Sequence, residues 1–183
     1  LDVLVNNAGI AGPTARCEDV VLADWERTLA VNLTGQFLCA RRAIPLLRAS
    51  RNASIANLSS AAGRFGFPMR SPYAASKWAV IGFTRSLSIE LGGDGIRVNA
   101  ICPGSVAGPR IDAVFANKAQ ARGVSAEQVR QEALAKTSLG QLIEPEDIGH
   151  AIVFLASRTG ARISGQAIGV DAEEPGRDSH AQS

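Results

Sequence analysis

Tyr73 and Lys77 stand four positions apart in the segment Tyr-Ala-Ala-Ser-Lys. The spacing of apolar residues such as Trp78 and Ile81 predicts a helix over 73–91. On a helix, side chains four positions apart lie on one face, with Cβ atoms about 5–6 Å apart. An ammonium beside a phenol favours the phenolate and lowers the pKa of the phenol from about 10. The pair predicts a tyrosine that transfers a proton near neutral pH, or else a surface tyrosine and a surface lysine that share a face.

Ser60 lies at the end of the apolar run 54–59, which predicts a buried strand. Glycines and prolines between residues 63 and 72 then predict a loop that leads to Tyr73. In an open α/β sheet, ligands bind at the edge where the strands end. This order predicts that one crevice gathers the hydroxyl of Ser60, the phenol of Tyr73 and the ammonium of Lys77.

Two further apolar runs end in small or polar residues. The run 1–5 is followed by Asn-Asn-Ala-Gly, and the run 96–102 is followed by Pro-Gly. We expect all three strand ends to line one groove.

Taken together, these motifs resemble the short-chain dehydrogenase/reductase family in order and spacing. The resemblance runs from Leu1 to about Asp171 and rests on the following segments: Asn6–Gly9, Asn32 within Val31–Gly35, Ser60, Tyr73 with Lys77, Arg97–Gly104 and Ile163–Asp171.

The resemblance implies a catalytic set of four residues. Tyr73 would exchange a proton with the substrate oxygen, and Ser60 would donate a hydrogen bond to that oxygen. Lys77 would lower the pKa of the phenol and hold the nicotinamide ribose. Asn32 would interrupt a helix and position a water behind Lys77, the alternative being an ordinary helix-interior or capping asparagine. Ser59 competes with Ser60 for its role, but the spacing to Tyr73 favours Ser60.

The resemblance also implies NAD or NADP as cofactor. The residues that it assigns to cofactor binding, besides Tyr73 and Lys77, are Asn6, Ala8 and Gly9 on the adenosine side and Pro103, Gly104 and Val106 beneath the nicotinamide. Two departures put single contacts in doubt. Gly108 stands where the family usually has a threonine, and Ala-Glu-Glu follows Asp171 where the family commonly has two glycines.

The predicted fold class is α/β, a partial Rossmann-type doubly wound parallel sheet of about four strands with flanking helices. The alternation of patterns places strands at 1–6, 54–59, 96–102 and 166–171, helices at 18–30, 33–49, 73–91 and 145–157, and a less regular helical region at 110–135.

The chain begins inside a strand and without a methionine. The resemblance implies further strands before Leu1, together with the glycine-rich turn that approaches the pyrophosphate. We therefore expect residues 1–171 to be the C-terminal part of one such domain and 172–183 to be a disordered tail. Strand 1–6 would then be an exposed apolar edge, and whether this part folds alone stays open.

The cysteine pattern favours a cytoplasmic protein, and the resemblance implies a small-molecule alcohol or ketone as substrate. Of 183 residues 46% are hydrophobic, the net charge is +2, and no apolar run approaches the length of a membrane span. Charges of both signs are mixed along the chain, so we expect neither a nucleic-acid partner nor a membrane partner. The three cysteines lack disulfide or metal-ligand spacing, which predicts free thiols and no metal site. By resemblance, helices 33–49 and 73–91 would form a homodimer or homotetramer.

These observations predict an NAD(P)-dependent oxidoreductase that interconverts a secondary alcohol and a ketone, with a 3-oxoacyl reductase-like enzyme as one possibility. Residues 107–138 would form a lid over the substrate, and Arg110 in this segment fits either a solvated arginine or a partner for an anionic group. The alternatives are a truncated product and a catalytically silent relative that acts as a binding or regulatory protein.

Overall fold

The computed structural model describes residues 1–135 and 137–172, so the predicted tail lies, from residue 173 on, outside the described residues. Its four strands form one parallel sheet in the order β1 (Val3–Asn6), β2 (Ser54–Leu58), β3 (Arg97–Pro103) and β4 (Ala167–Val170). Each strand pairs with the next one in the sequence. The predicted fold class, a partial Rossmann-type sheet with flanking helices, is confirmed.

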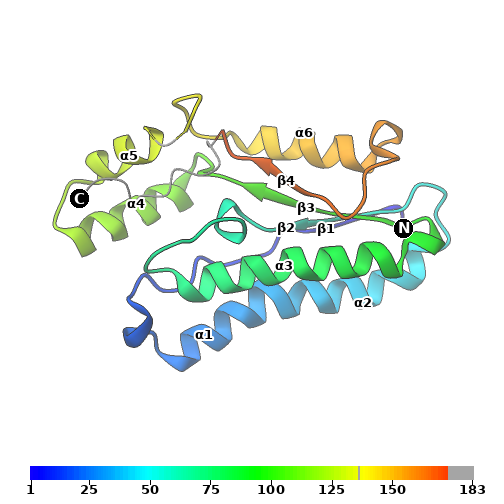
Figure 1. Ribbon diagram of the computed structural model, residues 1–183, viewed down its shortest axis with the longest axis horizontal. Helices are drawn as coiled ribbons and strands as arrows, with labels where there is room; N and C mark the ends of the chain where they lie inside the picture. The colour runs from blue at the N-terminus through cyan, green and yellow to red at the C-terminus, as the bar shows by residue number, and fades with distance from the viewer. Residues whose placement is uncertain (136, 173–183) are drawn as a thin grey trace.

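Helices cover both faces of the sheet (Figure 1). On one face lie α1 (Leu22–Leu29), α2 (Gly35–Leu47) and α3 (Ser71–Glu90), and on the other lies α6 (Pro145–Ala156). The remaining two helices, α4 (Pro109–Arg122) and α5 (Ala126–Leu134), follow β3 beyond the end of the sheet. This three-layer arrangement leaves the carboxyl edge of the strands open between α3, α4 and α6.

The core lies around the two central strands. Every residue of β2 is buried, and so is β3 except for its last residue. Both strands are buried because helices cover both faces of the sheet, and their buried polar side chains are hydrogen-bonded, as Asn57 is to Thr84 and Asn99 to the carbonyl of Ile163. On the α6 side, Leu155 packs with Leu58 and Ile101. The outer strand β1 is less protected, because the side chain of Val5 is 40% exposed.

The structure corrects several predicted boundaries. The two helices predicted at 18–30 and 33–49 are one helical run from Leu22 to Leu47, interrupted by a π-helical turn at Ala30–Thr34. The region 110–135 holds two regular helices rather than a less regular one. The helix predicted from Tyr73 begins two residues earlier, at Ser71. Pro72 fits its first turn because the N–H groups there have no partner inside the helix.

Trp78 also differs from expectation. It belongs to the apolar pattern that predicts the helix, yet it is 52% exposed. The buried face of α3 instead carries polar residues: Ser76, Lys77 and Thr84 lie there beside Val80 and Leu87. A buried lysine and two buried hydroxyls are unusual in a helix that only packs on a core. They indicate that α3 also contributes polar groups to a functional site.

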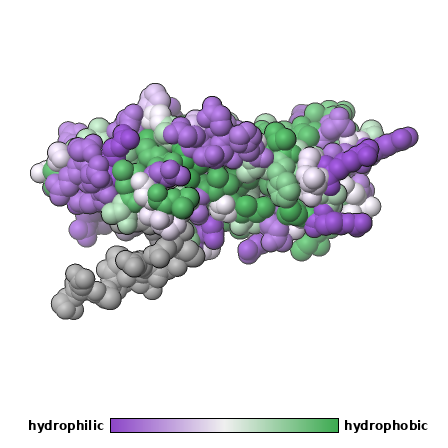
Figure 2. All heavy atoms as spheres, turned by 90° about the horizontal axis from the view of Figure 1, so that it is seen from above, coloured by the Kyte–Doolittle hydropathy of each residue, from purple (hydrophilic) through white to green (hydrophobic). Residues whose placement is uncertain are grey.

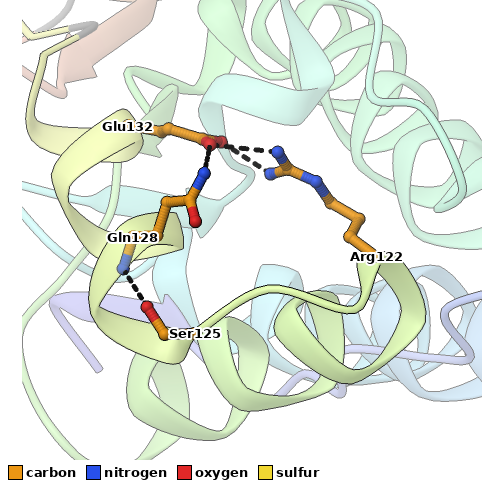
Figure 3. Close-up of polar contacts among 4 residues, drawn as sticks. All are labelled: Arg122, Ser125, Gln128 and Glu132. Atoms are coloured by element: carbon orange, nitrogen blue, oxygen red, sulfur yellow. Dashed lines mark hydrogen bonds and ion pairs between the residues drawn. The ribbon is translucent and has the colours of Figure 1, made fainter.

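Helices α4 and α5 form a hairpin that packs mainly on itself. Its small core consists of Phe115, Ala119 and Val129. Figure 3 shows the polar contacts that close the hairpin: Arg122 pairs with Glu132 through both terminal nitrogens, and Ser125 caps α5. The hairpin is thus a separate packing unit at the edge of the main core.

No helix in the described residues is long and apolar enough to cross a membrane.

Candidate active site

A cavity of about 620 Å³ opens at the carboxyl edge of the strands. Its walls come from the segments after β1, β2 and β3 and from helices α3, α4 and α6. Ser60, Tyr73 and Lys77 all line it. The three polar groups that the sequence predicts to meet in one crevice therefore share one cavity.

Lys77 is held below the surface by the end of β2. The side chain is 4% exposed, and its Nζ donates a hydrogen bond to the carbonyl of Leu58 at 2.8 Å. Nζ lies 5.7 Å from the centre of the Tyr73 ring. Burial lowers the pKa of Lys77 to about 8, with Arg110 adding to the effect and Cys102 opposing it. An ammonium has three N–H donors, so two remain to meet a ligand in the cavity.

The two neighbouring serines do different things. Ser59 is buried, and its hydroxyl donates to the carbonyl of Lys77 at 2.8 Å. Ser60 is half-buried, and its hydroxyl accepts only a long hydrogen bond, 3.2 Å, from the N–H of Ala62. The hydroxyl proton of Ser60 is thus free to meet a ligand oxygen, whereas that of Ser59 is already in use.

Asn32 lies in the π-helical turn and does not line the cavity. It is fully buried; its Oδ1 accepts from the N–H of Ile10, and its Nδ2 donates to the carbonyl of Ile10 and to the hydroxyl of Ser76. These bonds tie the loop after β1 to α3 one residue before Lys77. As predicted, Asn32 interrupts an α-helix. Its side chain supports the cavity through hydrogen bonds to two segments that border it.

The residues assigned to the adenosine side divide into two groups. Gly9 lines the cavity, and so does Asn7, which sequence reasoning missed. Asn6 and Ala8 do not line it. The side chain of Asn6 turns into the sheet and donates to Asn57 at 2.8 Å. Asn7 follows the last residue of β1 and lines the cavity instead.

On the nicotinamide side, all three predicted residues line the cavity: Pro103, Gly104 and Val106. A Cβ at Gly104 would lie 2.7 Å from the carbonyl oxygen of Asp171, so only glycine allows the two segments to pass. Asp171 also pairs with Arg64 at 3.1 Å. This ion pair joins the loop after β2 to the end of β4, and no motif in the sequence pointed to it.

Sequence reasoning also missed Arg70, which lies just before α3 and lines the cavity. Its side chain is 3% exposed and lies over the rings of Phe67 and Tyr73, with Cζ 5.7 and 5.4 Å from their centres. A lone arginine in a predicted loop gives no signal that it will be buried. Arg110, which the sequence leaves open, lines the cavity from α4 and donates to the carbonyl of Gly9 at 3.4 Å.

All three cysteines are free thiols. Cys102 is buried, and burial raises the pKa of its thiol, which disfavours the reactive thiolate. No cluster of His, Cys, Asp or Glu in the described part of the chain could hold a metal ion.

Comparison with known proteins places the chain in a family. A family model described as enoyl-(acyl carrier protein) reductase matches residues 1–172. The chain is 38% identical to a 3-oxoacyl-[acyl-carrier-protein] reductase from Thermotoga maritima over 176 residues, covering 93% of this chain and 65% of that protein. It belongs to the short-chain dehydrogenase/reductase family.

One further relative and one solved structure are also similar to this chain. The chain is 38% identical to an inactive 2-(S)-hydroxypropyl-CoM dehydrogenase from Xanthobacter autotrophicus, covering 92% of this chain and 70% of that protein. The crystal structure of levodione reductase superposes with a TM-score of 0.87 at 27% identity, covering 94% of this chain and 66% of that one. The chain thus spans about two thirds of the length of these three proteins.

Proposed function

We propose that this chain supplies the catalytic part of an NAD(P)-dependent oxidoreductase that interconverts a secondary alcohol and a ketone. The observation that carries the proposal is the cavity shared by Ser60, Tyr73 and the buried ammonium of Lys77. The reductase relatives are consistent with this class of reaction, and a 3-oxoacyl ketone is one substrate of the class.

The residues of the cavity fit a nicotinamide dinucleotide. Lys77 has two N–H donors left beside its bond to Leu58, which suits the hydroxyls of a ribose. Gly9 and Asn7 on one side and Pro103, Gly104 and Val106 on the other supply backbone groups and little side-chain bulk. The bound nicotinamide supplies or accepts the hydride.

In the direction of reduction, the hydroxyl of Tyr73 donates its proton to the carbonyl oxygen as that oxygen gains negative charge. Ser60 donates a hydrogen bond to the same oxygen, which stabilises the charge where it develops. Lys77 stabilises the phenolate that remains on Tyr73. Oxidation of the alcohol reverses each of these steps.

Replacing Tyr73 with Phe tests this assignment. The variant keeps the ring and its contact with Phe67, 6.3 Å between ring centres, but loses the proton donor. We expect nicotinamide-dependent turnover to fall by about 100-fold or more, with an unchanged circular dichroism spectrum and melting temperature. Full turnover in Tyr73→Phe would refute the role of the tyrosine. A protein that binds the dinucleotide without any turnover would instead match the catalytically silent alternative.

We also propose a homodimer or homotetramer formed through α2 and α3. The outer faces of these helices expose Phe37, Leu38, Trp78 and Ile89. A second apolar surface lies over α6 (Figure 2), where Val153 and Phe154 are exposed. Apolar patches of this kind mark interfaces. Light scattering should give two or four times the mass of the monomer. The mass of a single chain at high concentration would contradict the proposal.

A further inference from the structure

The cavity carries a one-sided charge. Three cationic side chains line it, those of Arg70, Lys77 and Arg110, and no aspartate or glutamate does so within the described ranges. The chain as a whole is nearly balanced, with 19 Lys and Arg against 17 Asp and Glu. The positive charge is therefore a property of this cavity, and it would attract an anionic ligand.

Arg70 is the unusual member of this group. Its Nη2 donates to the carbonyl of Ala11 at 2.6 Å, but its Nε is buried without a partner. Burial lowers the pKa of its guanidinium, while Tyr73 opposes this shift and Arg110 adds to it. An arginine nevertheless stays charged in proteins. A buried cation costs free energy unless an anion or acceptors compensate it, and one backbone carbonyl uses only part of its five N–H groups.

The position of Arg70 indicates which ligand would satisfy the remaining N–H groups of its guanidinium. Its Cζ lies 5.4 Å from the centre of the Tyr73 ring, so the guanidinium stands over the ring that carries the proton-transferring hydroxyl. Arg110 approaches the same cavity from α4, and its charge adds to the lowering of the pKa of both Arg70 and Lys77. A planar guanidinium binds a carboxylate through two parallel hydrogen bonds.

We propose that Arg70, assisted by Arg110, binds a carboxylate of the substrate, so that the substrate is a small oxo acid or hydroxy acid rather than a neutral ketone or alcohol. This inference rests on the proposed function. The carboxylate and the reacting carbonyl must be separated by only a few bonds, because the guanidinium and the phenol are neighbours.

Binding measurements with matched probes test the proposal directly. Isothermal titration would compare 4-oxopentanoate with its uncharged amide, 4-oxopentanamide, on the purified protein with and without NAD(H) or NADP(H). We expect the acid to bind about tenfold more tightly than the amide or better, since hydrogen bonds between charged groups are the strong ones. In Arg70→Met this preference should disappear. Arg51→Met is the matched control, because Arg51 is exposed in the turn before β2 and does not line the cavity.

Equal affinity for acid and amide in the unmodified protein, under all cofactor conditions, would overturn the proposal even if Arg70→Met does not fold. The phosphates of the dinucleotide are the other anions that could meet Arg70. If Arg70→Met weakens NADH or NADPH binding and leaves the acid preference intact, the arginine belongs to the cofactor site and the proposal is wrong.

Turnover separates this proposal from the proposed function. Reduction of neutral ketones with no preference for acids would contradict only the proposed carboxylate site. A clear preference for the acid in binding, without nicotinamide-dependent turnover of any ketone, would contradict only the proposed oxidoreductase function.

Discussion

The two walls of the cavity are built in different ways. The wall formed by the end of β2 and by α3 holds its polar groups through buried hydrogen bonds to the backbone, such as those from Lys77 to Leu58 and from Ser59 to Lys77. A second wall is the start of α4, and α4 belongs to the α4–α5 hairpin, which has its own small core and an exposed ion pair. The first wall is continuous with the sheet core, whereas the second packs mainly on itself.

This difference predicts how strongly each wall responds to substitution. Groups that transfer protons need a fixed geometry, which a buried wall provides. A hairpin that shares little core with the sheet can change sequence or move at lower cost in stability. We therefore expect substitutions in the first wall to have large effects and those in the hairpin to have small ones.

The two serines of the first wall give the sharpest test. Ser60→Ala should lower turnover by about 100-fold, because it removes a donor to the developing oxyanion, and should leave the melting temperature almost unchanged. Ser59→Ala leaves the carbonyl of Lys77 without its buried hydroxyl donor and should cost about 1 kcal/mol or more of stability. Kinetics and thermal melts of both variants decide the roles; the reverse pattern would assign the oxyanion contact to Ser59.

Burial of Lys77 predicts a pH-dependent stability. The pKa of Lys77 is lowered from 10.5 to about 8 in the folded protein. Between these two values the unfolded chain keeps a proton that the folded chain has released, so the free energy of unfolding rises with pH. Below pH 8 the cost of burying the ammonium is fully present, on the order of 3 kcal/mol.

Lys77→Met removes this cost together with the cation. The variant should be more stable than the unmodified protein below pH 8, the difference should shrink as pH rises toward 10.5, and turnover should be lost. Urea unfolding of both proteins across this pH range measures the effect. A difference that does not change with pH would contradict the buried, titrating lysine.

Close packing in the first wall predicts a steric effect at Gly63. A Cβ there would lie 2.5 Å from the hydroxyl of Ser59 and 2.7 Å from the carbonyl of Lys77. Gly63→Ala should cost about 1–3 kcal/mol of stability, as overpacking usually does. Gly66→Ala is the control, since nothing lies within 4 Å of its added Cβ. Equal denaturation midpoints for the two variants would show that the wall is looser than described.

The hairpin provides the smallest effect. Arg122 and Glu132 pair at 2.6 Å but are both exposed, 44% and 39% for the side chains. Exposed ion pairs contribute little to stability. The melting temperature of Arg122→Gln in differential scanning calorimetry should therefore equal that of the unmodified protein. A clear drop in the melting temperature would mean that the hairpin is coupled to the sheet core more tightly than its packing indicates.

Local patterns predicted much of the first wall and little of the second. The strand that ends before Ser60 and the helix that carries Tyr73 and Lys77 were readable because periodicity and turn residues act over short distances. The helical run through Asn32 was predicted as two helices, because the wider π-helical turn shifts the phase of the apolar pattern as a break between two helices would. The two helices of the hairpin looked irregular because they bury few apolar residues, only Phe115, Ala119 and Val129.

By itself, the sequence determined the parallel sheet, the one-turn spacing of Tyr73 and Lys77, and the family that their order indicates. Only the tertiary structure decided that Asn6 turns into the sheet while Asn7 meets the cavity, and that Arg70 is buried beside the phenol. The physical reason is that spacing fixes neighbours along one element, whereas the inward direction of a side chain depends on what packs against it from elsewhere in the chain.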